Sequence, residues 1–159
     1  MAIQAKRYHD ISVGHRVVGH EGKCRHFHGH NYRVHFTCEA HIEKDLPVDE
    51  IGRVIDFGEI KRRLCMWLED NWDHKFIYCI TDPVIKFLCE KSEYTTHEDI
   101  VIQSFVAVPF NPTAENMASY LLTTIGPLML KGTGIQLVDV TIEETAKCSA
   151  TANFKARLE

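Results

Sequence analysis

The 159-residue sequence lacks several features that mark special classes of protein. It has no uninterrupted apolar run of about 20 residues, the length needed to cross a bilayer, so we expect no membrane association. Acidic residues (22) outnumber lysine and arginine (18), and the net charge of −4 argues against a nucleic-acid partner. The amino terminus, MAIQAKRYHD, has neither an apolar signal segment nor twin arginines, so we expect a cytoplasmic protein.

The sequence also lacks cysteine pairs in a C-x-x-C pattern. Its six cysteines are scattered singly along the chain. In a cytosolic protein this spacing favours reduced thiols over disulfides, and a reduced thiol can act as a base or a nucleophile. The chain contains no low-complexity segment, long linker or repeat. Its composition of 45% hydrophobic and 25% charged residues is close to the globular average. We therefore expect one domain over residues 1–159.

Histidine is the residue present in excess. Eight of the ten histidines lie within residues 9–41, and the other two are His74 and His97. A short segment this rich in imidazole indicates metal binding or acid–base chemistry.

The hydrophobic periodicity predicts an α+β fold with a mostly antiparallel sheet. Apolar and polar side chains alternate in the strands predicted near both ends of the chain. One helix begins at the N-cap Asp56, with Glu59 completing a capping box, and another begins at Thr113. The predicted strands cover residues 7–15, 28–43, 100–110, 135–144 and 149–154, and the predicted helices cover residues 57–71, about 83–91 and 113–126.

The strongest chemical motif is His28-Gly29-His30. Histidines at positions i and i+2 of a strand project to the same side with Cα atoms about 6.5 Å apart, so both imidazoles can bind one ion. His15 is the best third ligand, because it ends the first strand on that strand's apolar face. Three histidines with an open position are typical of a catalytic zinc site, and the alternative for each is an ordinary buried or surface histidine. That ordinary role is assigned to His9, His20, His26, His35 and His41.

Two further positions are candidates for acid–base chemistry. Cys24 lies four residues before His28, where a metal ion and imidazoles would favour its thiolate, and the alternative is a small apolar filler. Asp73 precedes His74, and a neighbouring carboxylate can orient an imidazole for proton transfer. Adjacent Asp-His pairs are also common on protein surfaces, so both interpretations stay open at this point.

Alternation along the predicted strand 135–144 separates two neighbouring glutamates. Glu143 falls on the polar face and is expected in solvent, whereas Glu144 ends the apolar face, where an ionised carboxylate needs a partner. A ligand edge with two adjacent N–H donors would suit Glu144. The alternative is a strand-end carboxylate turned to water.

Six motifs resemble those of the 6-pyruvoyl-tetrahydropterin synthase family, in order and through nearly the whole chain. They are VGHRV around His15, CRHFHGHNY from Cys24, IDFGEIK at 55–61, Asp73-His74, NPTAENMA at 111–118 and EET at 143–145. The spacing C-x-x-x-H-G-H resembles the bacterial branch, 6-carboxy-5,6,7,8-tetrahydropterin synthase of the queuosine and 7-deazapurine pathway.

The resemblance implies a role for each candidate residue. Cys24 would remove a proton from carbon, the Asp73-His74 pair would relay protons on the opposite side of the substrate, and Glu144 would anchor the pterin ring. The implied zinc ligands are His15, His28 and His30. The implied catalytic residues are Cys24, Asp73, His74 and Glu144, and the implied substrate-binding residues are Glu144, Thr113 and Glu115.

The resemblance also implies a fold, a substrate and an assembly. The fold would be the tunnelling fold, a four-stranded antiparallel sheet with two helices on one face. Subunits would form trimeric barrels, usually stacked as hexamers, with active sites between subunits. The substrate would be 7,8-dihydroneopterin triphosphate, from which the bacterial branch releases acetaldehyde and triphosphate.

Two departures from the family pattern bear on substrate preference. The segment after Asp73 reads DHKFIY where the family has a hydrophobic residue and Asn after the Asp-His pair, and residues 83–108 form a predicted insertion. Two alternative functions therefore stay open. One is another pterin side-chain reaction on the same fold, either pyruvoyl-tetrahydropterin formation or cleavage to a hydroxymethyl pterin. The other is a non-catalytic zinc- or pterin-binding module.

Overall fold

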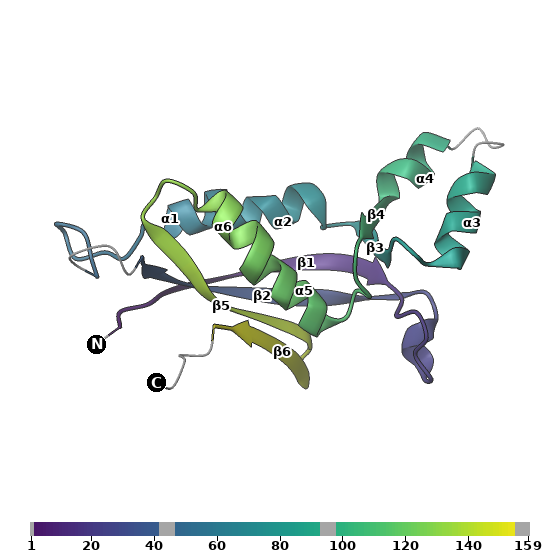
Figure 1. The fold of residues 1–159 in the computed structure, drawn as a ribbon, viewed down its shortest axis with the longest axis horizontal. Coiled ribbons are helices and arrows are strands. Elements are labelled where there is room, and N and C mark those ends of the chain that lie inside the picture. The colour runs from purple at the N-terminus through teal and green to yellow at the C-terminus, as the bar shows by residue number, and fades with distance from the viewer. Residues whose placement is uncertain (1, 42–46, 93–97, 155–159) are drawn as a thin grey trace.

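A curled, mixed sheet of six strands organises the chain. A computed structural model describes residues 2–41, 47–92 and 98–154. The strand order is β4-β3-β1-β2-β5-β6, in which β1, β2, β5 and β6 are antiparallel neighbours (Figure 1). The strands are β1 (Ala5–His15), β2 (His28–Ala40), β3 (Lys75–Cys79), β4 (Phe105–Val108), β5 (Ile135–Thr145) and β6 (Cys148–Asn153).

The four antiparallel strands match the prediction. Two short strands widen the sheet: β3 was not predicted, and β4 forms part of the strand predicted over residues 100–110. β3 runs parallel to the last three residues of β1, and β4 runs parallel to β3. The prediction of one strand over residues 100–110 is wrong in its first half, because α4 (Glu98–Ser104) precedes β4 there. Ile100 and Ile102 are exposed, so no buried sheet face selects the extended form at these positions. β2 ends at Ala40, and the predicted continuation to residue 43 enters residues 42–46, outside the described part of the chain.

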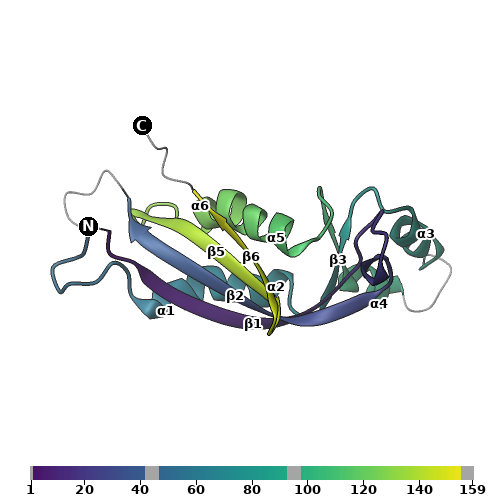
Figure 2. The same cartoon turned by 90° about the horizontal axis from the view of Figure 1, so that it is seen from below.

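Two long helices cross one face of the sheet. The first comprises α1 (Phe57–Ile60), a π-helical segment (Lys61–Cys65) and α2 (Met66–Asn71). The second comprises α5 (Ala114–Tyr120), a π-helical segment (Leu121–Ile125) and α6 (Gly126–Met129). α3 (Pro83–Ser92) and α4 lie at the end of the sheet near β3 and β4, and Figure 2 shows the curvature of the long strands. No described helix has the length and apolar character needed to span a membrane.

The core lies between the helices and one face of the sheet. Side chains of β2 alternate as predicted, so Tyr32, Val34 and Phe36 are buried. Each large apolar side chain buried in this way stabilises the fold by about 1.5–3 kcal/mol. The helices contribute Ile60, Leu64, Leu68, Met117, Leu121 and Ile125, and Trp72 follows directly after α2.

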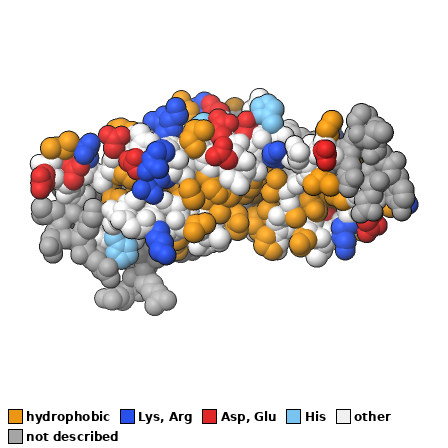
Figure 3. Space-filling model, turned by 90° about the horizontal axis from the view of Figure 1, so that it is seen from above, with side chains coloured by type: hydrophobic (Ala, Val, Ile, Leu, Met, Phe, Trp, Pro, Cys, Tyr) orange, Lys and Arg blue, Asp and Glu red, His pale blue; other side chains and the backbone are white. Residues whose placement is uncertain are grey.

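Hydrophobic side chains are also exposed on the surface, along the middle of the face drawn in Figure 3. Exposed apolar side chains that gather in this way are a common property of association surfaces.

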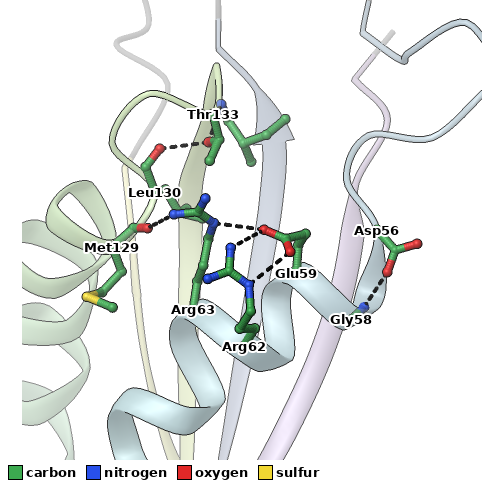
Figure 4. Close-up of polar contacts among 9 residues, drawn as sticks. Asp56, Gly58, Glu59, Arg62, Arg63, Met129, Leu130 and Thr133 are labelled. Carbon is green, nitrogen blue, oxygen red and sulfur yellow. Dashed lines mark hydrogen bonds and ion pairs between the residues drawn. The ribbon is translucent and has the colours of Figure 1, made fainter.

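The first helix begins at the predicted N-cap. The Asp56 carboxylate accepts a hydrogen bond from the Gly58 amide at 2.7 Å, which satisfies one of the free N–H groups at the helix start (Figure 4). The predicted capping box is wrong, because the Glu59 carboxylate turns away from Asp56 and pairs with Arg62 at 2.7 Å and Arg63 at 3.0 Å. Three charge-assisted bonds on the helix surface therefore replace the single bond that a capping box would supply.

Arg63 connects the two long helices at one end. Its guanidinium donates to the carbonyl oxygen of Met129, the last residue of α6, at 3.0 Å (Figure 4). Beyond it, the Thr133 hydroxyl donates to the Leu130 carbonyl oxygen at 2.7 Å. The Arg63 bond satisfies a carbonyl group at the helix end, and the Leu130 carbonyl accepts from both the hydroxyl and the amide of Thr133.

The cap at Asp56 predicts a measurable loss of stability. Asp56→Ala removes the acceptor and should lower the free energy of unfolding by about 1 kcal/mol, or the melting temperature by roughly 2–4 °C. Asp56→Asn keeps an acceptor oxygen but removes the charge that faces Arg53 at 3.3 Å, and should melt close to the wild type. Thermal unfolding followed by circular dichroism compares the variants. Equal losses in both would assign the effect to the ion pair instead of the cap.

Candidate functional site

Three histidines converge where β1 ends and β2 begins. The β1–β2 register places His15 directly opposite His28 and Val13 opposite His30. One nitrogen atom from each imidazole lies within 4.8 Å of the others, which is close enough for one metal ion to bind all three. Gly29 lies between the two β2 ligands, where a Cβ atom would approach the Val13 carbonyl oxygen to 2.8 Å. The glycine of the motif is therefore required by close backbone packing.

Backbone hydrogen bonds orient two of these rings. Nδ1 of His15 lies 2.7 Å from the Pro112 carbonyl oxygen, and Nδ1 of His28 lies 2.8 Å from the His26 carbonyl oxygen. A carbonyl can only accept, so both Nδ1 atoms carry the proton and the neutral rings present the Nε2 lone pair. Nε2 of His30 is buried and has no hydrogen-bond partner among the described residues, as expected for an atom that would bind a metal. This donor set fits a metal ion.

Burial favours the neutral form of the rings. It lowers the pKa of His15, and this effect exceeds the opposite effects of the Pro112 hydrogen bond and the Glu144 carboxylate. Burial also lowers the pKa of His30, against the raising effect of Glu144. A neutral imidazole has a lone pair free for a metal, so both residues are prepared as ligands near pH 7.

A buried tyrosine and a glutamate complete the polar cluster. Tyr32 follows His30 on the same face of β2, and its hydroxyl lies 3.2 Å from Nε2 of His15. The same hydroxyl donates to Oε2 of Glu144 at 3.3 Å, and Oε1 of Glu144 lies 3.6 Å from Nε2 of His30. Burial and the Glu144 charge raise the pKa of Tyr32, so its hydroxyl keeps its proton. Glu143 points to the other face of the sheet, where it contacts His35 at 2.6 Å, as the alternation indicates.

A hollow of about 190 Å³ opens beside His15. Three polar candidates line it with Glu144: Cys24 from the loop between β1 and β2, and Thr113 and Glu115 from the start of α5. Thr113 is also the N-cap of α5, because its hydroxyl accepts a hydrogen bond from the Asn116 amide at 3.3 Å. The tertiary structure thus brings together the predicted metal ligands, the candidate base and the three candidate substrate-binding residues.

Asn111 holds the loop that carries Cys24. Its side-chain amide accepts from the Val18 amide and donates to the Val18 carbonyl, both at 2.8 Å. A backbone bond also closes the loop, from the Val17 amide to the Cys24 carbonyl at 2.8 Å. The sequence motifs alone do not predict the roles of Asn111 and Tyr32. Strand alternation could have indicated Tyr32, because it follows His28 and His30 at the same spacing.

Asp73 and His74 line a different hollow, of about 590 Å³, on the opposite face of the sheet. The His74 ring is 82% exposed, its Nδ1 lies 2.6 Å from the Asp73 carboxylate, and its backbone is in the left-handed region with φ 55°. Ser12 holds both residues, since its amide donates to Asp73 and its carbonyl accepts from the His74 amide, each at 2.8 Å. Burial raises the pKa of Asp73, but the bonds from Ser12 and His74 outweigh it and lower the pKa below its ordinary value.

Within one chain, the two halves of the predicted machinery are therefore apart. Cys24 and Glu144 line the hollow beside His15, whereas Asp73 and His74 line the hollow on the other face. A third hollow, over Gly14 and Gly29, is lined by His74 together with His28 and His30, but not by Cys24.

Comparison with known proteins decides the family. The sequence profile described as 6-pyruvoyl tetrahydropterin synthase matches residues 4–154. The chain belongs to this family. A curated relative from Rickettsia bellii, named 6-carboxy-5,6,7,8-tetrahydropterin synthase, is 32% identical over 146 residues, which are 92% of this chain and 96% of the relative. The 6-pyruvoyl tetrahydropterin synthase family is thus a family of enzymes, and its members include synthases of the carboxy type.

Solved structures of similar proteins agree with the fold. A crystal structure of a Wolinella succinogenes protein superposes with a TM-score of 0.82 and 25% identity, covering 98% of this chain and 99% of the other. The 6-pyruvoyl tetrahydropterin synthase of Caenorhabditis elegans superposes with a TM-score of 0.62 and 24% identity, covering 98% and 97%. The α+β tunnelling fold expected from the sequence motifs is confirmed. In this chain its antiparallel sheet is lengthened by β3 and β4.

The three-histidine cluster predicts one divalent metal ion per chain. His30→Ala removes one ligand and should weaken metal binding at least about 100-fold. His35→Ala deletes the same side chain from the opposite face of β2 and serves as the matched control. Metal content after dialysis and competition with a chromophoric chelator measure both. Equal metal retention in the two variants would contradict the site.

Proposed function

We propose that this protein is a cytoplasmic, zinc-dependent 6-carboxy-5,6,7,8-tetrahydropterin synthase. It would convert 7,8-dihydroneopterin triphosphate and water to 6-carboxy-5,6,7,8-tetrahydropterin, acetaldehyde and triphosphate, for queuosine or another 7-deazapurine. The observation that carries the proposal is the convergence of three imidazoles beside a hollow that is lined by the thiol of Cys24 and the carboxylate of Glu144. The C-x-x-x-H-G-H spacing and the names of the curated relatives favour the carboxy-forming reaction.

Zinc is the metal we propose for the three histidines. The site offers three neutral imidazole nitrogens. Backbone carbonyl groups orient two of the rings through their Nδ1 atoms, as is usual in catalytic zinc sites. A zinc ion there would polarise hydroxyl groups of the substrate side chain and acidify the neighbouring C–H bonds.

Cys24 and Glu144 act on the substrate from the walls of the hollow. Cys24, as the thiolate, removes a proton from a side-chain carbon, and Glu144 accepts hydrogen bonds from the amino and ring N–H groups of the pterin. Anchoring the ring by a carboxylate fixes which carbon faces the thiol, and this positioning contributes to the rate as well as to specificity. Thr113 and Glu115 form the wall beside Glu144.

Asp73 and His74 serve a neighbouring subunit in this proposal. Their hollow lies on the sheet face opposite to Cys24, and the left-handed backbone at His74 presents the ring to solvent, where a second chain can meet it. Strand edges suited to self-association support the assembly. Among the described residues, Ala5–Ile11 pair with β2 alone and β6 pairs with β5 alone, so both edges can add a strand. We therefore propose a trimer or hexamer with active sites between subunits.

The reaction itself tests the proposal. The zinc-loaded protein should release acetaldehyde from 7,8-dihydroneopterin triphosphate and yield a carboxylated pterin, identified by mass. Cys24→Ala should lower kcat about 100-fold or more, as expected for loss of a general base, while zinc content stays unchanged. Cys79→Ala, a half-buried thiol on β3, is the control.

Other products would replace the proposal with a specific alternative. A pterin that keeps all three side-chain carbons would identify a pyruvoyl-forming enzyme. A hydroxymethyl pterin would identify side-chain cleavage. Binding of zinc and pterin without any turnover would identify a binding module.

Mixed oligomers test the shared active site. Cys24→Ala and His74→Ala should each be inactive alone, because each lacks one half of the machinery. Co-expressed in equal amounts, they should recover about one quarter of wild-type activity, since each random interface joins the two intact halves with that probability. No recovery would place Cys24 and His74 of one chain in the same site.

A further inference from the structure

We infer that Tyr32 is a positioning residue that couples metal occupancy to recognition of the pterin ring, an inference that rests on the proposed function. Tyr32 is 0% exposed and lies between the two parts of the site. Its hydroxyl is 3.2 Å from Nε2 of the metal ligand His15 and 3.3 Å from Oε2 of the proposed ring anchor Glu144. Its ring also packs edge-on against His15 and His30, with centroids 5.9 Å and 5.3 Å apart.

The hydroxyl has one proton and two acceptors. Nδ1 of His15 is committed as a donor to the Pro112 carbonyl, so Nε2 of the neutral ring carries a lone pair. Without a metal, Tyr32 can therefore donate either to this lone pair or to Glu144. A metal ion uses the Nε2 lone pair, and Glu144 is then the acceptor that remains. Metal binding thus directs the Tyr32 proton to the carboxylate.

This bond determines what the carboxylate can do. Glu144 reaches the edge of the metal site, because its Oε1 lies 3.6 Å from Nε2 of His30. The bond from Tyr32 holds the group by Oε2, and hydrogen bonds to a charged acceptor are strong enough to select one side-chain position. A carboxylate released from Tyr32 can turn to the metal as a fourth ligand, where it would occupy the open position and no longer face the pterin.

The coupling is reciprocal. If a bound metal orders Glu144 for the pterin edge, a bound pterin must raise the affinity for the metal by the same factor. Tyr32 is the structural link, since its hydroxyl is in contact with one group from each side. Removing the oxygen should reduce the coupling without removing a metal ligand or the ring anchor.

The test is a binding cycle on Tyr32→Phe. The probe is 6-methylpterin, which lacks side-chain hydroxyls, and its dissociation constant is measured by fluorescence with and without Zn²⁺. Zinc should tighten pterin binding in the wild type. We compare the pterin dissociation constant without zinc with the same constant in the presence of zinc. The ratio of the two should be about tenfold smaller in Tyr32→Phe than in the wild type, as expected for one hydrogen bond to a charged group.

Controls separate this inference from a general loss of structure. Tyr120→Phe makes the same change in a ring that stacks on Trp72 at 6.3 Å, away from the site, and should keep the wild-type ratio. Melting temperatures verify folding, and Tyr32→Leu is the second variant if Tyr32→Phe fails to fold. An unchanged ratio in the folded variant, or no coupling in the wild type, would overturn the role of Tyr32. A wild type that binds zinc but no pterin would instead overturn the proposed function.

Discussion

The antiparallel pairing of β1 with β2 is the constraint on which the rest of the site depends. Its register sets His15 opposite His28, and the two-residue period of the strand then places His30 and Tyr32 on the same side. A slip of one residue would turn all three β2 side chains to the other face. Gly29 allows the two backbones to approach closely at this point, so the ladder of backbone hydrogen bonds itself defines the distance between the ligands.

The sheet also separates two kinds of chemistry. The face covered by helices is dry enough to lower the pKa of His15 and to keep Tyr32 protonated, which suits metal binding and recognition of a ligand edge. The opposite face carries Asp73 and His74 in a wide polar hollow. Groups that need different environments are thus held by the two sides of the same strands, and the proposed oligomer would bring them together.

Local signals predicted the fold where they were strong and failed where they were short. The caps at Asp56 and Thr113 depend on side chains within three residues, so both are readable from the chain alone. The predicted capping box failed because the Glu59 side chain adopts a rotamer that pairs with Arg62 and Arg63. Local sequence does not indicate which of these partners a glutamate selects. β3 is too short to show a period and was missed, whereas β4 was predicted as part of a longer strand over residues 100–110.

The sequence by itself determined the three candidate metal ligands, His15, His28 and His30, and the side of β5 that carries Glu144, because strand alternation is a local property that needs no knowledge of distant contacts. Only the tertiary structure decided that Tyr32 lies between His15 and Glu144, and that Cys24 and His74 of one chain line different hollows. Tyr32 and Glu144 are 112 residues apart. Contacts over such separations follow from how strands pair and helices cover them, and local periodicity carries no information about them.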